Sequence, residues 1–210
     1  MRIAGTLLAL ALCLGPSAAS AADQSPFTYW IATLSWSPEY CRQNLTSKEP
    51  QCLEENTFVP ADLRPHVSGP EWECDTDETV PKELLDRMVV MMKNVATVKR
   101  VWRKSGACSR MPMKDYFLQL ERAGRKVNVP SAYRDVQEDL KTTPAEIREA
   151  FVRVNDGLVP EAMIMDCRSK YVQTVSFCLD GEFNFRACGI DLSEDCKSEV
   201  RLRRLSSKFR

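Results

Sequence analysis

The chain has 210 residues, in which 29 lysines and arginines balance 29 aspartates and glutamates. A hydrophobic content of 44%, with only 8 glycines and 12 prolines, excludes a largely disordered, collagen-like or low-complexity protein. The neutral balance also excludes a protein that binds nucleic acid because it is basic throughout, so any such binding requires a local basic patch.

The N-terminus has the pattern of a secretory signal peptide. Met1 and Arg2 give it a positive start, residues 3–14 are largely apolar, and Ala19-Ser20-Ala21 matches an A-x-A cleavage site. The apolar run is shorter than the ~20 residues that span a bilayer, which disfavours the alternative, a membrane anchor. We therefore expect residues 1–21 to be removed. The mature protein is then exported, periplasmic or extracellular, with no integral membrane segment.

The chain contains 9 cysteines and 1 histidine. Removal of the signal peptide takes away Cys13 and leaves an even number, which in an exported protein indicates disulfides. The alternative is a metal site, but there is no C-x-x-C and histidine is scarce, so we expect no metal and no cofactor. The sequence alone does not choose among the possible pairings. The remaining cysteines are Cys41, Cys52, Cys74, Cys108, Cys167, Cys178, Cys188 and Cys196.

Strand patterns come first in the mature chain. Aromatic and β-branched residues predict a strand over 27–36, and a short strand over 57–59 is expected to stop at Pro60. Residues 65–78 are rich in proline, glycine and acidic side chains, so we expect an exposed loop there.

Helical patterns follow. Pro81 suits the first turn of a helix, and later helices are predicted over 98–103, ending before Gly106, and over 114–123. Thr143-Pro144-Ala145-Glu146 forms a capping box that begins another helix, which Asp156-Gly157 ends. The apolar face of the first of these helices consists of Leu84, Leu85, Met88 and Met92, which we expect in the core.

Strand patterns return near the end of the chain. Strands are predicted over 163–165 and 171–179, and a hairpin turn at Asp180-Gly181 leads to a further strand over 183–186. The order of strands, helices and strands predicts a single α+β domain.

Three segments together resemble the T2 ribonuclease family of secreted endoribonucleases. Residues 29–41 are similar to the family's opening strand, which ends in Trp-x-Pro-x-x-Cys. Residues 101–108 are similar to the second half of its active-site helix, His-Glu-Trp-x-Lys-His-Gly-x-Cys. The last cysteines, with Leu179-Asp180, are similar to its C-terminal strands.

The resemblance implies one ribonuclease T2-like domain over residues 22–200. Its fold would be α+β, with a central antiparallel sheet flanked by helices. The resemblance also implies four disulfides, which pair Cys41 with Cys52, Cys74 with Cys108, Cys167 with Cys196, and Cys178 with Cys188.

The family cleaves RNA with two histidines that this sequence lacks. One takes the proton of the ribose 2′-hydroxyl and the other protonates the leaving oxygen, which gives a 2′,3′-cyclic phosphate. Ala61 holds the position of the first histidine. In the helix, Arg100, Val101 and Ser105 replace a histidine, a glutamate and the second catalytic histidine, whereas Lys104 is retained. Each proton-transfer role is worth ~10²–10⁴ in rate, so we expect cleavage to be lost.

The remaining cations suggest a non-catalytic binding protein. Arg100 and Lys104 lie one helical turn apart and share a face, and Arg103 and Arg64 add to a patch that would hold the phosphates of RNA or another polyanion. A protein bound in the same cleft is a further possibility. The alternative interpretation of the patch is a solvated basic helix face that binds nothing.

His66 supports a second hypothesis, a residual or altered endoribonuclease in which this histidine acts with Lys104 in a rearranged site. The alternative interpretation of His66 is an exposed loop residue. A third hypothesis is a protein-interaction module that does not use the cleft.

Residues 201–210 are predicted to form a basic C-terminal tail. Such a tail binds RNA, lipopolysaccharide or a membrane surface in some proteins, and in others it is only solvated and frayed. The cations of this tail are Arg201, Arg203, Arg204, Lys208 and Arg210.

Overall fold

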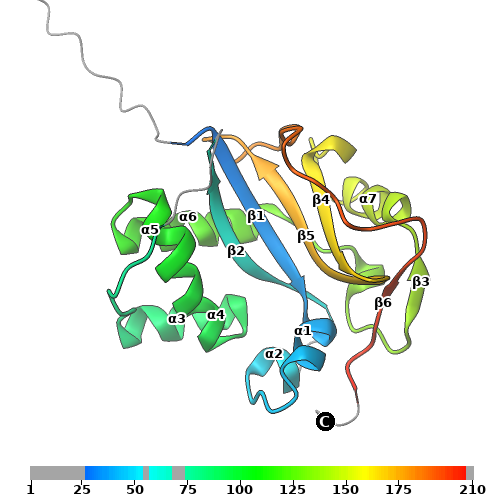
Figure 1. Cartoon of the computed structure of the whole chain (residues 1–210), viewed down its shortest axis with the longest axis horizontal. Helices are drawn as coiled ribbons and strands as arrows, with labels where there is room; N and C mark the ends of the chain where they lie inside the picture. Colours follow the sequence, from blue (N-terminus) through cyan, green and yellow to red (C-terminus); the bar gives the residue numbers. More distant parts are fainter. Residues whose placement is uncertain (1–26, 54–56, 68–73, 207–210) are drawn as a thin grey trace, which may run out of the picture.

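The computed structural model describes residues 27–53, 57–67 and 74–206, so the predicted signal peptide lies outside the described residues. A six-stranded sheet is flanked by helices, which confirms the predicted α+β fold (Figure 1). In this part of the chain, none of the helices has the length and apolar character that a bilayer crossing requires.

The sheet is almost entirely antiparallel. Its strands are β1 (Tyr29–Trp36), β2 (Phe58–His66), β3 (Leu140–Thr142), β4 (Met163–Arg168), β5 (Tyr171–Leu179) and β6 (Val200–Leu202). The strand order is β2-β1-β5-β6-β3, and β4 pairs with β5. The exception is one parallel pair, which joins Tyr171 of β5 to Arg201 of β6.

β2 continues through Pro60 to His66, so the prediction that Pro60 stops this strand is wrong. β2 lies at the edge of the sheet, where a proline that lacks an N–H can leave the ladder intact. A β-bulge opposite Thr33 and Leu34 leaves Ala61 without a partner on β1. The longer strand carries three residues of the predicted site region, Asp62, Arg64 and His66, on one side, because side chains alternate along a strand.

The helices surround the sheet on both flanks. They are α1 (Ser37–Gln43), α2 (Pro50–Leu53), α3 (Lys82–Met92), α4 (Val95–Val101), the π-helical turn η1 (Trp102–Gly106), α5 (Ala107–Ser109), α6 (Met113–Lys126), the 3₁₀ turn η2 (Ser131–Tyr133), α7 (Pro144–Val152) and the 3₁₀ turn η3 (Pro160–Ala162). The predicted capping box is present, because Thr143 and Glu146 bond to each other's backbone N–H.

The helical segment that carries the candidate site does not end before Gly106. α4, η1 and α5 follow one another without a break as far as Ser109. A Cβ atom on Gly106 would lie 2.3 Å from Cε3 of Trp102, a distance that real side chains do not show. Gly106 therefore acts here as a close-packing residue inside the helix rather than as a helix end.

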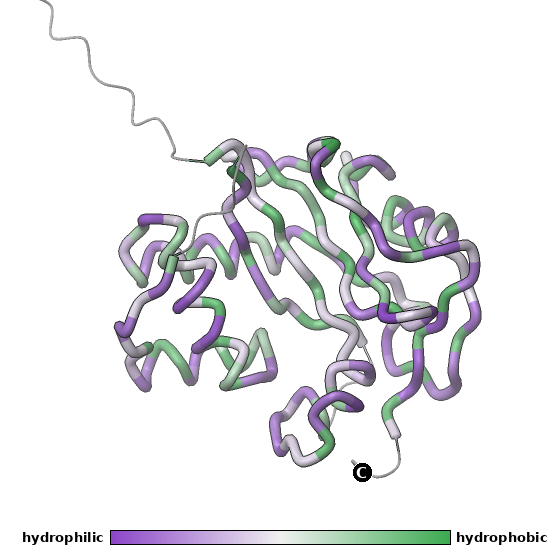
Figure 2. Tube along the Cα trace, in the orientation of Figure 1, coloured by the Kyte–Doolittle hydropathy of each residue, from purple (hydrophilic) through white to green (hydrophobic). Residues whose placement is uncertain are grey.

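Two hydrophobic clusters join the sheet to the helices. One packs Trp30 and Leu63 of the sheet against Met88 and Met92, which are fully buried as predicted. The other packs residues of β5 beneath Phe151 of α7. Figure 1 shows α3, α4 and α6 grouped beside β2 and α7 beyond β4, and apolar and polar positions alternate along the chain (Figure 2).

Four disulfides tie the connections to these elements, and they are the pairs that the resemblance implies. One of them joins the loop before α3 to α5, next to the candidate site. The bridges are Cys41–Cys52, Cys74–Cys108, Cys167–Cys196 and Cys178–Cys188.

The C-terminal residues through Ser206 belong to the fold, which differs from the expected boundary at residue 200. β6 pairs with β3, and neither strand was predicted. Leu205 is 2% exposed and packs beside the Cys41–Cys52 bridge. The indole Nε1 of Trp36 donates a hydrogen bond to the carbonyl of Arg203 over 2.8 Å. The first half of the predicted tail is therefore docked, while Lys208 and Arg210 lie outside the described residues.

The predicted strand over 183–186 is wrong. Residues 180–184 form a turn in which the Asp180 carboxylate accepts the backbone N–H groups of Glu182 and Asn184 over 2.9 and 2.8 Å. A single bridge, between Leu179 and Phe185, is all the strand pairing that follows.

Candidate functional site

A groove crosses one face of the sheet. It consists of three adjoining cavities of about 440, 360 and 280 Å³. The first and second share Ile31, Arg64 and Leu192, and the second and third share Thr33, Asp62 and Thr174. Because neighbouring cavities share their walls, we treat them as one continuous groove over β2, β1 and β5.

The positions at which the resemblance predicts substituted catalytic residues lie together in this groove, with one exception. Nη2 of Arg100, on α4, donates a hydrogen bond to the carbonyl of Ala61 over 3.3 Å. Ser105, in the π-helical turn, bonds to the side chain of Asp62, the next residue of β2. Val101 points elsewhere, because it is fully buried in the core between helices and sheet. The structure thus brings together Ala61, Arg100 and Ser105 and leaves Val101 out.

Asp62 is the unexpected residue of the site. Burial raises the pKa of its carboxyl, while the Ser105 hydrogen bond and the Arg100 and Arg64 guanidinium groups oppose that rise. Within the described residues, its Oδ1 is buried without a hydrogen-bond partner. Asp62 was not among the predicted site residues, and the signal that sequence reasoning missed is a charged residue directly after Ala61 and two residues before Arg64.

Tyr116 supports this arrangement from beneath β2. Its hydroxyl donates a hydrogen bond to the carbonyl of Leu63 over 2.9 Å, and the ring is fully buried. Burial, reinforced by the nearby Asp62 carboxylate, raises the pKa of Tyr116 well above its usual value. The phenol therefore stays protonated and acts as a donor that fixes the strand.

Lys104 and Arg103 share a carboxylate from the loop before α3. Nζ of Lys104 lies 2.8 Å from Oδ2 of Asp75, and Nε of Arg103 lies 3.4 Å from Oδ1. The hydrogen bond from Lys104 holds the pKa of Asp75 below its usual range. Both cations are about half exposed, so the pairs are weak, but they reduce the charge that this helix presents to the groove.

His66 is a buried residue of β2, so the alternative interpretation of it as an exposed loop residue is wrong. Its exposed fraction is 7%, and its ring lies 4.2 Å from that of Tyr29. Nε2 lies 3.0 Å from Oδ2 of Asp191, although this contact lacks the alignment of a hydrogen bond. Burial lowers the pKa of His66, Asp191 opposes that shift, and Arg64 adds to it, so the imidazole is neutral near pH 7.

The same cavity contains His66, Lys104 and Ser105, together with Arg64 and the Cys74–Cys108 bridge. It therefore holds a neutral base and cations near each other. In the described ranges, the His, Cys, Asp and Glu side chains form no group of three or more that would hold a metal ion. Arg100 lines the other end of the groove beside Ala61 and Asp62.

Solved ribonuclease-like structures share this fold at low sequence identity. Trichomaglin, described as a novel S-like ribonuclease, has a TM-score of 0.65 at 20% identity, over 86% of this chain and 100% of that chain. The RNase-related protein from Calystegia sepium has a TM-score of 0.64 at 17% identity, over 86% of this chain and 98% of that chain. RNase NT, solved in complex with 5′-AMP, has a TM-score of 0.61 at 17% identity, with coverage of 85% and 98%.

These likenesses concern the fold alone. A comparison with curated proteins gives no match. The model of the Ribonuclease T2 family matches residues 27–188, a span that runs from β1 past β5 and includes most of the groove. The chain therefore belongs to the Ribonuclease T2 family.

Proposed function

We propose that this protein binds RNA in the groove and does not cleave it by the two-histidine route. The observation that carries the proposal is the identity of the residues at the two catalytic positions, Ala61 and Ser105, which meet in the groove beside Arg100. A methyl group transfers no proton, and a serine hydroxyl, even one bonded to a carboxyl group as Ser105 is to Asp62, exchanges protons far less readily than an imidazole near neutral pH.

The groove retains groups that suit phosphate. Arg64, Arg100 and Lys104 all line it, and guanidinium groups bind phosphate oxygens in pairs without giving up a proton. Asp62 and Asp75 offset part of this positive charge, so we expect binding that is weak and sensitive to salt.

Export is part of the proposal. The signal-peptide pattern of residues 1–21 directs the chain out of the cytoplasm, and four disulfides favour an oxidising compartment, periplasmic or extracellular.

The test combines cleavage and binding by the mature, oxidised protein. A fluorescent single-stranded RNA is incubated with the protein from acidic to neutral pH, with His66→Ala and Lys104→Ala variants beside it to reveal contaminating nuclease. We expect no cleavage above the level of these variants. Fluorescence anisotropy should show binding that weakens with salt and with Arg100→Ala. RNA binding whose affinity is the same at high salt and in Arg100→Ala would contradict the proposal.

A second candidate function rests on one specific contact set. His66 is neutral, lies beside Asp191 and lines the same cavity as Lys104, which is the arrangement of a general base next to a cation. This favours an altered endoribonuclease as the alternative. Cleavage that disappears in His66→Ala, while Lys82→Ala, which removes an exposed cation of α3, retains it, would establish this function in place of the first.

A further inference from the structure

A second cationic region lies around Tyr171, the first residue of β5. We call it the Tyr171 surface. The groove lies over β2, β1 and the middle of β5. The Tyr171 surface is built instead from the end of α1, the β4–β5 turn and β6. Its members are Tyr171 and the surrounding cations Arg42, Arg168, Lys170, Arg201 and Arg203.

These side chains form one connected set. Cζ of Arg203 lies 3.2 Å from the centroid of the Tyr171 ring, and Nζ of Lys170 lies 5.9 Å from it. Arg201 pairs with Tyr171 in the sheet, and its backbone N–H donates to the carbonyl of Lys170 over 2.7 Å. The strand pairs and the ring contacts therefore hold these cations on one side of the sheet end.

Arg168 connects the set to α1. It pairs with Tyr171 across the β4–β5 turn, and its Nη1 donates a hydrogen bond to Oε1 of Gln43 over 3.3 Å. Gln43 is the last residue of α1 and follows Arg42 directly. Arg42 and Arg168 are both exposed, so their guanidinium groups face solvent on neighbouring elements.

Glu39 supplies a carboxylate to these cations, and Glu138 and Asp139 line the concave surface that adjoins them. Nη1 of Arg203 lies 3.4 Å from both carboxylate oxygens of Glu39, but Glu39 is only 5% exposed and lies beneath the arginine. The pKa of Tyr171 is lowered by the hydrogen bond with Arg203 and by the charges of Arg203, Lys170 and Arg201. Cations thus dominate the field at the ring.

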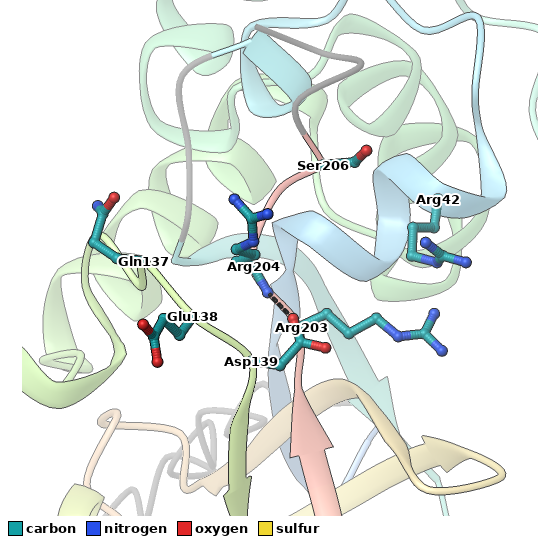
Figure 3. A pocket seen from close by; sticks show the side chains of 7 residues that line it. All are labelled: Arg42, Gln137, Glu138, Asp139, Arg203, Arg204 and Ser206. Atoms are coloured by element: carbon teal, nitrogen blue, oxygen red, sulfur yellow. Dashed lines mark hydrogen bonds between the residues drawn. The ribbon is translucent and has the colours of Figure 1, made fainter.

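A concave surface adjoins these residues. It encloses about 730 Å³ and is lined by Arg42, Arg203 and Arg204 together with residues 137–139 and Ser206. Figure 3 shows Arg42 and Arg203 extending to the same side of it, while Gln137 and Glu138 lie on the other side. Asp139 accepts the backbone N–H of Arg204 over 3.1 Å, drawn as the dashed line in Figure 3.

We infer that the Tyr171 surface binds the phosphates of a single-stranded RNA that leaves the groove over α1. The groove reaches α1 at Tyr40, and the end of the same helix contacts the Tyr171 surface through the hydrogen bond from Arg168 to Gln43. Arginines outnumber lysines here, and a guanidinium group binds phosphate through two parallel hydrogen bonds. The Arg203–Tyr171 stack adds a planar face of the kind on which bases stack. The choice of RNA as the ligand rests on the proposed function of the groove.

The test compares three variants of the mature, oxidised protein. Arg42→Gln with Arg168→Gln removes two charges from the Tyr171 surface, and Arg100→Ala weakens the groove. Lys82→Gln with Arg125→Gln is the matched control, since it removes two exposed charges from α3 and α6. Each protein is titrated with a labelled RNA of about 4 nucleotides and one of about 20 nucleotides, sizes that bracket one and several binding positions. Thermal unfolding verifies that the variants fold as the wild type does.

The Tyr171-surface variant should bind the long RNA roughly fivefold to tenfold more weakly than the wild type. The slope of its log affinity against log salt should be smaller by about 1.4, because each of the two lost phosphate contacts contributes about 0.7 for a single strand. Its affinity for the short RNA should be unchanged, and the control should match the wild type for both RNAs. An unchanged slope for the long RNA overturns the inference. The inference is also overturned if the substitutions at Arg42 and Arg168 weaken binding to phosphatidylglycerol vesicles but leave binding to RNA unchanged.

Failure of the proposed function gives a different result. In that case Arg100→Ala leaves the affinity for the short RNA unchanged, whatever the Tyr171-surface variant does. The two sites are thus tested by different RNA lengths and different residues.

Discussion

The groove and the Tyr171 surface are both built around arginines and lysines, but they differ in where the carboxylates that contact these cations lie. Asp62 lies among Arg64, Arg100 and the Ser105 hydroxyl. On the helix above, one carboxylate of the loop before α3 holds two cations at 2.8 and 3.4 Å. Much of the positive charge that the sequence places in the groove is therefore offset inside the protein.

At the Tyr171 surface, the cations surround an aromatic ring, and the contacting carboxylate, Glu39, is buried beneath them. The comparison teaches that the number of basic residues does not decide where a polyanion binds. The position of the protein's own carboxylates decides how much of that charge a ligand meets.

The residues predicted at the family's catalytic positions contact their neighbours across the groove. Arg100 bonds to the Ala61 carbonyl, and Ser105 bonds to Asp62. These two contacts join β2 to the helical segment beside it.

The largest effect should come from releasing the loop that carries Asp75 to the groove. Cys74→Ser with Cys108→Ser opens a bridge with a sequence separation of 34 residues, and we expect the free energy of unfolding to fall by about 3–4 kcal/mol. Chemical denaturation of the oxidised proteins measures this. Cys178→Ser with Cys188→Ser, whose separation is 10 residues, is the comparison and should cost about 1 kcal/mol less. Equal losses would contradict the loop-length argument.

A smaller effect should follow from disturbing the helix beside the groove. Gly106→Ala places a methyl group 2.3 Å from Trp102, so we expect a loss of about 1–3 kcal/mol of folding stability and weaker binding of short RNA. Gly181→Ala is the control, because nothing lies within 4 Å of the added Cβ there. Thermal unfolding and anisotropy report both changes. Equal stability of the two variants would refute the close packing of Gly106.

Asp62 should make RNA binding in the groove depend on pH. Its folded pKa is raised, so protonation near and below that pKa removes the internal anion, and binding of short RNA should tighten as pH falls. At pH values where the wild-type carboxyl is ionised, Asp62→Asn should bind roughly tenfold more tightly than the wild type, as expected for one charge removed at about 10 Å, and its pH profile should be flatter. If Asp62→Asn shows the same pH dependence of RNA binding as the wild type, Asp62 is not the group that causes it.

The same shift affects folding. Because the folded pKa of Asp62 lies above the unfolded value, the folded state binds this proton more tightly. The resulting stability is fully present below the unfolded pKa and is lost as pH rises through the folded pKa. Denaturation at several pH values should show this loss in the wild type and a weaker one in Asp62→Asn.

The smallest effect is expected at Asp75. Asp75→Asn frees Lys104 and Arg103, so binding of short RNA should tighten by roughly twofold to fivefold at low salt, the range typical of exposed ion pairs. Asp77→Asn removes a charge from the same loop and is the matched control. If both variants tighten binding equally, the effect belongs to the overall charge of the loop and not to the contact with Lys104.

The local patterns of the sequence predict much of the fold. Strand-type residues predict β1, β4 and β5, and the Thr143 capping box predicts the start of α7, because these signals depend on neighbours in the chain. The disulfide pairs come from the resemblance to the family, since spacing alone allows many connectivities.

The parts that were missed depend on contacts between distant residues. The continuation of β2 through Pro60 follows from its place at the sheet edge. The burial of His66 follows from its position on β2 and its packing against Tyr29. The role of Asp62 follows from Ser105, which lies on another element.

The prolines of β2 have a consequence for the outer edge of the sheet. Pro60 and Pro65 both lie within this edge strand, and neither has an N–H to offer to another strand. An edge of that kind is a poor template for a second polypeptide, which limits the strand-by-strand growth that leads to aggregation. This protection matters most before the disulfides form, when partly folded chains are present at high concentration and can aggregate.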